Sequence, residues 1–307
     1  MKISVIGAGN VGSLAAMRIA QMSLGEITLV DIAGGIARGK SLDLEDAQSI
    51  LNSDYHITGS SDISAINGSD IVVITAGLAR KPGMTREELL MKNSRIIKEV
   101  SLKIKELAKD AVVIVVTNPL DLMTYLVLKV TGFKRQKVIG MGISLDSSRF
   151  ANLIAARLKL PVSDVEAVVI GSHGEAMMHL AGKTKVKGKP LADILSKEEI
   201  DNLVKMTVDR GAQIVANLGS GSAFFAPSAA AAQVAEAIAN DRKSVIGVCA
   251  FLEGEYGLSG ICIGVPCRIG KGGIEEIVKL DLSSEELSRL KDSADAIARL
   301  IPGLKDV

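Results

Sequence analysis

A glycine-rich turn directly after an apolar run is the feature that most constrains the fold of this chain. Residues 3–6 read ISVI, and GAGNVG follows at positions 7–12, matching the pattern G-x-G-x-x-G. In such a turn the first glycine permits a tight bend, the second lets the backbone approach a pyrophosphate, and the third lets a helix pack closely on the strand. A helix predicted from about Val11 to Met22 would direct its N-terminal N–H groups toward the phosphates. A single match to G-x-G-x-x-G also fits a tight strand-to-helix turn that binds no ligand.

An acidic residue after the next apolar run strengthens the dinucleotide interpretation. The predicted strand at 27–30 ends at Asp31, 19 residues after Gly12. A carboxylate there accepts a hydrogen bond from the adenosine ribose and repels a 2′-phosphate. The sequence therefore predicts NAD rather than NADP as the cofactor. The predicted cofactor-binding residues of this region are Gly7, Gly9, Asn10, Val11, Gly12 and Asp31.

The first half of the chain alternates short apolar runs with helical patterns. Strands are predicted at 3–6, 27–30, 71–75, 112–116 and 138–141, and the clearest amphipathic helix at 87–108. This alternation predicts a parallel sheet covered on both faces.

The second half is more mixed. A strand is predicted at 165–170, helices at 197–218 and 228–240, paired strands at 245–251 and 258–265, and a last helix from Ser283. We therefore expect an α/β protein. A Rossmann-type parallel sheet with helices on both faces would occupy residues 1–142, and an α+β catalytic domain would occupy residues 143–307.

Composition excludes several classes of function. The chain carries 36 Lys and Arg against 35 Asp and Glu, and only 3% aromatic residues, which argues against a nucleic-acid partner. No apolar run reaches the ~18 residues of a membrane span, and the start MKISVIGAG does not resemble a secretory signal. We therefore expect no membrane partner and a cytoplasmic protein. Cys249, Cys262 and Cys267 fit neither a disulfide framework nor a zinc site, so no metal is expected.

Three histidines limit the choice of an acid–base group. His56 lies in a polar stretch typical of a surface, and His179 lies beside apolar residues, as a packed histidine would. His173 is flanked by glycines in GSHGE at 171–175, just after an apolar strand. Catalytic groups often gather in such loops. From position alone, a catalytic and a structural role are equally favoured.

Basic residues supply the remaining candidates. Residues 77–86 (GLARKPGMTR) form a cationic loop, which is either a plain solvent-exposed loop or a lid that closes on an anionic substrate. Asp146 and Arg149 are three residues apart, so a helix would place both on one face. A simple ion pair within the helix is the alternative interpretation of these two residues.

Together these segments resemble the lactate/malate dehydrogenase family. GAGNVG, LVD, ARKPGMTR, TNP, LDSSR, GSHG and GSAFFAPSAA follow one another over essentially the whole chain. The resemblance implies that His173 is the proton donor and acceptor and that Asp146 is its carboxylate partner. It also implies that Arg149 binds the substrate carboxylate, that Arg86 polarises the reacting carbonyl, and that Asn118 contacts both substrate and cofactor.

The resemblance places Arg80 at the position that selects the substrate. A cation there would face a methyl group in pyruvate but a carboxylate in oxaloacetate, and an unpaired buried charge is costly. Lactate dehydrogenases of the family have glutamine at this position. The resemblance therefore implies NAD-dependent interconversion of the dicarboxylates (S)-malate and oxaloacetate. Lactate or another 2-hydroxy acid is the alternative substrate, and a non-catalytic NAD(H) sensor is a remote alternative.

Two further expectations accompany the resemblance. Asn93 is expected to bind the cofactor, and the chain is expected to form a homodimer or homotetramer. The family often has Glu before its catalytic histidine and Asp after the following glycine, where this chain has Ser172 and Glu175. We therefore expect the hydrogen bonds around His173 to differ from the family pattern.

Overall fold

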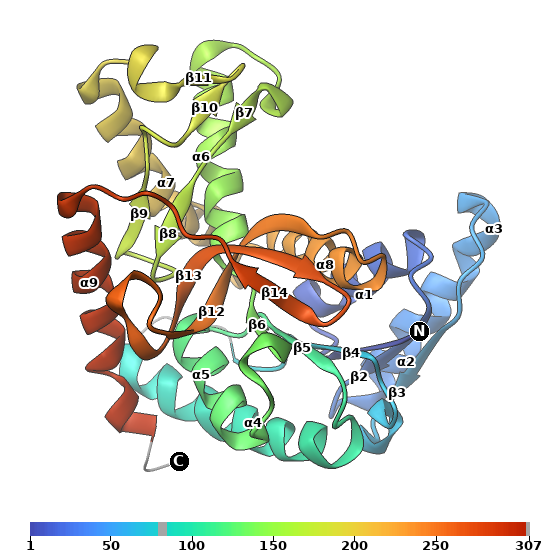
Figure 1. Cartoon of the computed structure of the whole chain (residues 1–307). Helices are drawn as coiled ribbons and strands as arrows, with labels where there is room; N and C mark the ends of the chain where they lie inside the picture. The colour runs from blue at the N-terminus through green and yellow to red at the C-terminus, as the bar shows by residue number, and fades with distance from the viewer. Residues whose placement is uncertain (79–84, 305–307) are drawn as a thin grey trace.

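Six parallel strands form the sheet of the first half of the chain (Figure 1). The computed structural model describes residues 1–78 and 85–304. The spatial order of the strands is β3-β2-β1-β4-β5-β6, the order of a dinucleotide-binding fold. Their bounds are β1 Lys2–Ile6, β2 Glu26–Val30, β3 Ile57–Ser60, β4 Ile71–Ile74, β5 Val112–Val115 and β6 Val138–Gly140.

The central strands are buried because almost every residue in them is apolar. All four residues of β4 and all four of β5 are buried. The predicted strands of this half agree with β1, β2, β4, β5 and β6 to within one residue at each end. The sequence analysis did not predict β3, since this edge strand buries only Ile57 and so has no apolar run.

Helices cover both faces of the sheet, as predicted. Figure 1 shows α4 and α5 on one side and α1 and α8 on the other. The long helix α4 starts with a capping box, in which Thr85 and Glu88 each accept from the other's backbone N–H. The helices of this half are α1 Asn10–Gln21, α2 Gly34–Asp46, α3 Gln48–Leu51, α4 Arg86–Leu107 and α5 Leu120–Thr131, with short 3₁₀ turns at Ile63–Ile66 and Arg135–Lys137.

The second half continues the same sheet instead of building a separate one. The strand β12 pairs antiparallel with β6 through Cys249 and Gly140, and β13, β8 and β9 follow, giving eleven strands with β14. These strands are β8 Val169–Gly171, β9 Met177–His179, β12 Ser244–Glu253, β13 Ser259–Gly270 and β14 Gly273–Ile277. The helices are α6 Ile143–Leu158, α7 Lys197–Leu218, α8 Phe225–Ala239 and α9 Ser284–Ala298. Shorter 3₁₀ turns occur at Val162–Asp164, Leu191–Asp193, Glu255–Gly257 and Ile301–Leu304.

The predicted strand at 165–170 is two strands. β7 (Val165–Glu166) joins β10 (Lys185–Val186) and β11 (Lys189–Pro190) in a small sheet, whereas β8 belongs to the large sheet. Figure 1 shows the small sheet at the far end of α6. The chain changes sheets at Val168, whose backbone N–H donates to Thr184 and whose carbonyl accepts from Leu180. The predicted fold class is confirmed. The prediction of one strand at 165–170 was wrong.

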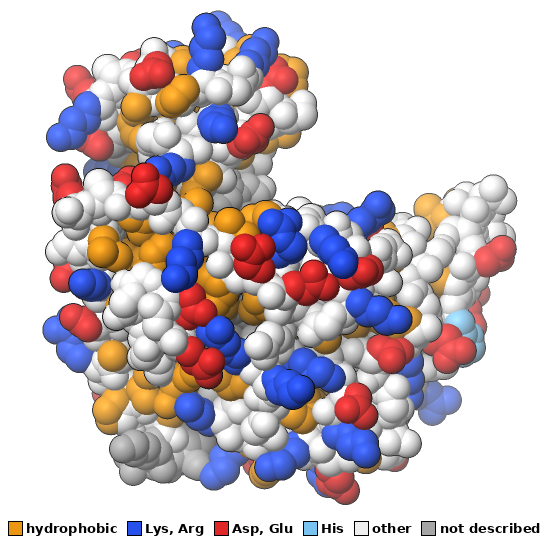
Figure 2. Space-filling view, in the orientation of Figure 1, with side chains coloured by type: hydrophobic (Ala, Val, Ile, Leu, Met, Phe, Trp, Pro, Cys, Tyr) orange, Lys and Arg blue, Asp and Glu red, His pale blue; other side chains and the backbone are white. Residues whose placement is uncertain are grey.

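The chain carries nearly equal numbers of basic and acidic residues, 36 Lys and Arg against 35 Asp and Glu. Figure 2 shows basic and acidic side chains interspersed over the visible face. No helix in the described part of the chain is long and apolar enough to cross a membrane.

His179 is packed inside the second half, as predicted, and His56 is exposed, as predicted. The His179 ring meets Phe150 edge-on, with 4.7 Å between ring centroids. Neither ring nitrogen has a hydrogen-bond partner among the described residues. Burial lowers the pKa of His179 to about 4, so the folded protein favours the neutral ring.

This burial predicts a loss of stability in acid. The unfolded chain binds a proton on His179 below about pH 6.5, while the folded protein binds it only near pH 4. Stability is therefore lost as the pH falls between these values. We expect the free energy of unfolding of His179→Leu, measured in urea and taken relative to that of the wild type, to rise by roughly 2–3 kcal/mol as the pH falls from 7 to 4.5. The control, His56→Leu at the exposed histidine, should show no such gain. A constant difference between His179→Leu and the wild type would contradict the prediction.

Candidate active site

The glycine loop has room for a ligand at one of its three glycines. Gly7 has φ +106°, and a Cβ there would lie 2.6 Å from the Ala76 nitrogen. A Cβ on Gly12 would lie 1.8 Å from the Gly7 carbonyl oxygen. The fold itself thus requires these two glycines. A Cβ on Gly9 would meet no atom within 4 Å, and Gly9 precedes α1 without a side-chain cap. The loop therefore presents an open helix N-terminus to an anion.

Asp31 is held beside this loop at the end of β2. Its Oδ2 atom accepts from the Ala8 N–H at 2.6 Å, and its Oδ1 atom accepts from the Ala33 N–H at 2.9 Å. Each carboxylate oxygen has further lone pairs for a ribose hydroxyl. This geometry fits the adenosine half of NAD.

Lys40 is a part of this region that the sequence analysis missed. Its Nζ atom, from α2, donates to the Ala8 carbonyl at 2.7 Å and to the Ser13 hydroxyl at 2.9 Å. The lysine thus links α2 to the glycine loop and places a positive charge beside it. Its spacing from the motif carries no recognised signal, because α2 is brought here only by the fold.

Asn93 joins two loops at the ends of β4 and β5. Its side chain is buried, and its Oδ1 atom accepts from the Leu78 N–H at 2.8 Å. Its Nδ2 atom donates to the Asn118 carbonyl at 2.7 Å. Asn118 is exposed and forms a cis peptide bond with Pro119. The fold therefore places both predicted asparagines at the carboxyl edge of the parallel sheet, where ligands bind in such folds.

A buried carboxylate connects the acid–base candidate with an arginine. Asp146 lies in the first turn of α6 and is fully buried. Its Oδ2 atom is 2.6 Å from His173 Nδ1, and its Oδ1 atom is 3.3 Å from an Arg149 guanidinium nitrogen. The intrahelical ion pair considered for Asp146 and Arg149 is present, but the same carboxylate also holds the histidine.

The charge of Asp146 determines the proton affinity of His173. Burial by itself lowers the pKa of His173, but the negative charge of Asp146 and its hydrogen bond outweigh this effect, so the pKa is raised. With a proton on Nδ1 directed to Asp146, Nε2 is the ring atom left to exchange a proton with a ligand. The His173 and Arg149 side chains retain 16% and 14% exposure, so both can reach a bound molecule.

The two other predicted arginines fall outside what can be described. Arg80 lies outside the described residues, and so does the whole segment 79–84 of the cationic loop. Arg86 is the first residue of α4, but its side chain also lies outside the described part. The choice between an exposed loop and a lid therefore stays a prediction.

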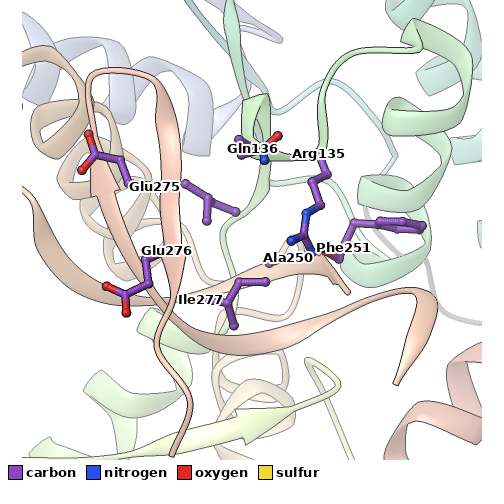
Figure 3. A pocket seen from close by; sticks show the side chains of 8 residues that line it. Arg135, Gln136, Ala250, Phe251, Glu275, Glu276 and Ile277 are labelled. Atoms are coloured by element: carbon purple, nitrogen blue, oxygen red, sulfur yellow. Dashed lines mark hydrogen bonds between the residues drawn. The ribbon is translucent and has the colours of Figure 1, made fainter. Parts of the chain in front are cut away.

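Two other observations concern metal-ligating residues and cavities. In the described ranges, no three His, Cys, Asp or Glu side chains gather as a metal site. A pocket of about 100 Å³ lies between the turn at Arg135–Lys137, β12 and β14. Figure 3 shows Arg135 beside Phe251 in this pocket, and its guanidinium is already bound to Glu253 and Glu255. None of the residues that line this pocket is a predicted site residue.

The glycine loop with its acid and the histidine with its carboxylate define an NAD-dependent oxidoreductase. Family models agree with this class. Residues 1–140 match the NAD-binding domain, and residues 143–303 match the α/β C-terminal domain, of lactate/malate dehydrogenases. The chain belongs to the lactate/malate dehydrogenase family. The predictions of the family and of NAD as the cofactor are confirmed.

Individual relatives match over the full length. A malate dehydrogenase of Methanosarcina barkeri is 49% identical over 304 residues, covering 99% of each chain. The structure of a malate dehydrogenase from Cryptosporidium parvum has a TM-score of 0.97 at 38% identity, covering 100% of this chain and 99% of that one. A lactate dehydrogenase from the same organism, complexed with lactic acid and the cofactor, has a TM-score of 0.96 at 39% identity, covering 100% and 98%.

The open space at Gly9 leads to a prediction. Gly9→Ala should leave the melting temperature within about 2 °C of the wild type. It should weaken NADH binding by about tenfold or more, since the new methyl group occupies the space next to the phosphates. Gly12→Ala should lower both stability and binding, because its methyl group collides with the Gly7 carbonyl.

Fluorescence titration with NADH and thermal melting measure the two effects. Gly35→Ala is the matched control, because a Cβ there also meets no atom within 4 Å. Wild-type NADH affinity in Gly9→Ala would show that the dinucleotide does not approach this glycine.

Proposed function

We propose that this oxidoreductase interconverts (S)-malate and oxaloacetate with NAD. The observation that carries the proposal is the buried Asp146 carboxylate between the His173 imidazole at 2.6 Å and the Arg149 guanidinium at 3.3 Å. The His173 imidazole can exchange a proton, and the Arg149 guanidinium can bind a carboxylate. Relatives named malate dehydrogenase, 44–49% identical over nearly the full length, support the choice of substrate.

The proposed mechanism depends on the proton affinity of His173. In malate oxidation Nε2 of neutral His173 accepts the proton of the C2 hydroxyl group. NAD, when bound, supplies the hydride acceptor. Asp146 keeps the imidazole oriented and stabilises the imidazolium that forms. The planar Arg149 guanidinium pairs with the C1 carboxylate through two N–H groups, which a lysine could not do.

The roles of the remaining residues follow from the family resemblance. Arg86 polarises the C2 oxygen, and Asn118 contacts that oxygen and the cofactor. Arg80 pairs with the distal carboxylate. Asn93 supports cofactor binding by holding the loops that contain Leu78 and Asn118.

Lactate is the second candidate substrate, and one observation favours it. The lactate dehydrogenase of C. parvum is as similar to this chain in fold and sequence as the malate dehydrogenase of that organism. The fold therefore does not distinguish the two substrates. Arg80, which would face a methyl group if the substrate were pyruvate, supports the dicarboxylate.

Replacing Arg80 should reverse the preference. Arg80→Gln should lower kcat/KM for oxaloacetate by about a hundredfold, the loss of a charge-assisted hydrogen bond, and should improve pyruvate relative to it. Steady-state rates with NADH and each keto acid give the ratio. Lys81→Gln removes the same charge one residue further along and should leave the ratio unchanged. An unchanged ratio in Arg80→Gln would exclude the proposed role in specificity.

Replacing His173 should separate chemistry from cofactor binding. His173→Asn should lower kcat by about 10²–10⁴-fold, because no other group replaces the proton acceptor. NADH binding, measured by fluorescence, should remain within about twofold of the wild type. Near-normal turnover in His173→Asn would remove this residue from the mechanism.

We also propose that the chain works as a homodimer or homotetramer. Large apolar side chains are exposed on the surface helices, including Ile50 at 85% on α3 and Phe225 at 64% on α8. Exposed apolar area of this kind is typical of protein contacts.

Two further proposals concern location and domains. The three cysteines carry free, buried thiols, which supports a reducing, cytoplasmic setting. The division into an NAD-binding domain at 1–142 and a catalytic domain at 143–307 is supported by the start of α6 at Ile143.

A further inference from the structure

A second carboxylate, that of Asp121, contacts His173, the residue proposed to exchange the proton. Asp121 is in the first turn of α5 and is only 5% exposed. Its Oδ2 atom accepts from the His173 backbone N–H at 2.9 Å and from the Ser172 hydroxyl at 2.8 Å. Its Oδ1 atom is buried without a hydrogen bond of ordinary geometry among the described residues. The Cys249 thiol of β12, a weak donor, is the other polar neighbour of this carboxylate.

The loop that carries His173 is held from two directions. From one side, Asp121 of α5 binds two consecutive residues of the loop. From the other side, the Ser293 hydroxyl of α9 accepts from the Ser172 N–H and donates to the Ala176 carbonyl, both at 2.9 Å. The loop itself has backbone that favours glycine, with φ +94° at Gly171 and +131° at Gly174. Such a loop needs external contacts to hold one conformation.

We propose that Asp121 is a positioning residue for His173, holding its backbone and supplying a second buried negative charge that favours the imidazolium. The inference rests on the proposed role of His173 as the group that exchanges the proton. Asp146 contacts the ring, whereas Asp121 contacts the main chain of the same residue. The two carboxylates come from different helices, Asp146 from α6 and Asp121 from α5.

The charged groups around the histidine are consistent with this role. Among the described residues, His173 faces Asp146 and Arg149 from α6 and Asp121 from α5. Both carboxylates raise the pKa of His173, and Arg149 lowers it. The pKa of Asp121 is raised, because burial outweighs the lowering effects of Cys249, the charge of His173 and the two hydrogen bonds from the loop. Cys262 is a further thiol neighbour of Cys249. A proton arriving on His173 therefore stabilises the ionised form of Asp121, and the reverse also holds.

This arrangement gives a physical reason for Ser172. By the resemblance, the family often has a glutamate at this position. A hydroxyl donates to Asp121, whereas a second carboxylate in the same buried region would repel it and disfavour ionisation. The hydrogen bond from Ser172 therefore favours the ionised form of Asp121.

The test is a titration of the His173 ring itself, followed by NMR in the NADH-bound enzyme with ¹³C-labelled histidine. The chain has three histidines, so His173→Asn identifies the signal by its loss. Asp121→Asn keeps an acceptor for the loop but removes the charge, and should reduce the proton affinity of His173 by about three- to tenfold. The alkaline limb of the pH profile of kcat/KM for oxaloacetate should move to lower pH by the logarithm of that factor.

Ser293→Ala is the matched control, because it removes a loop contact without changing any charge. It should reduce kcat while leaving the titration midpoint in place. Ser172→Ala provides a second test if Asp121→Asn does not fold. Loss of one donor makes Asp121 easier to protonate, so the proton affinity of His173 should fall by about twofold.

An unchanged titration midpoint in both Asp121→Asn and Ser172→Ala would overturn the proposal and leave the proposed function intact. If the wild type does not reduce oxaloacetate but the His173 titration midpoint still shifts in Asp121→Asn, the proposed function fails. The link between Asp121 and His173 is then still supported.

Discussion

A fully buried carboxylate must find partners within the protein, and the arrangement of the candidate active site follows from this requirement at Asp146. Its two oxygens are used separately, one by the His173 ring and one by the Arg149 guanidinium. The desolvation cost of burying the carboxylate is offset only if both partners stay in place. The interaction therefore fixes the relative positions of the His173 ring and the Arg149 guanidinium, the groups proposed to exchange a proton with one substrate and to bind its carboxylate.

The continuous sheet makes this interaction possible. β6 pairs with β12 at Gly140 and Cys249, and a Cβ at Gly140 would lie 2.8 Å from the Cys249 Cβ. This close contact joins the two halves of the chain. The start of α5, the start of α6 and the turn after β8 lie close together, since Asp121 and Asp146 both contact His173. Asp121, Asp146 and His173 come from these three segments, so the site is a property of the junction and of neither half alone.

The fold of the first half could be predicted well because its signals are local. The apolar runs that became β1, β4 and β5 are buried, and the glycine loop lies where its motif predicts. Prediction was poorer where burial is partial or pairing partners are distant. β3 buries one residue, and the residues predicted as one strand at 165–170 pair with two different sheets. Of the candidate site, the sequence analysis predicted His173, Asp146 and Arg149, which the structure brings into contact. It missed Asp121 and Lys40, whose partners lie 52 and 32 residues away.

The sequence by itself determined the glycine turn with its helix, the acid after the second strand and the three-residue spacing of Asp146 and Arg149, because each depends on neighbours along the chain. Only the tertiary structure decided that Asp146 contacts the ring of His173 and Asp121 its backbone. It also decided that Lys40 reaches the glycine loop. Those contacts join residues far apart in sequence, and their strength depends on the exclusion of water, which only packing brings about.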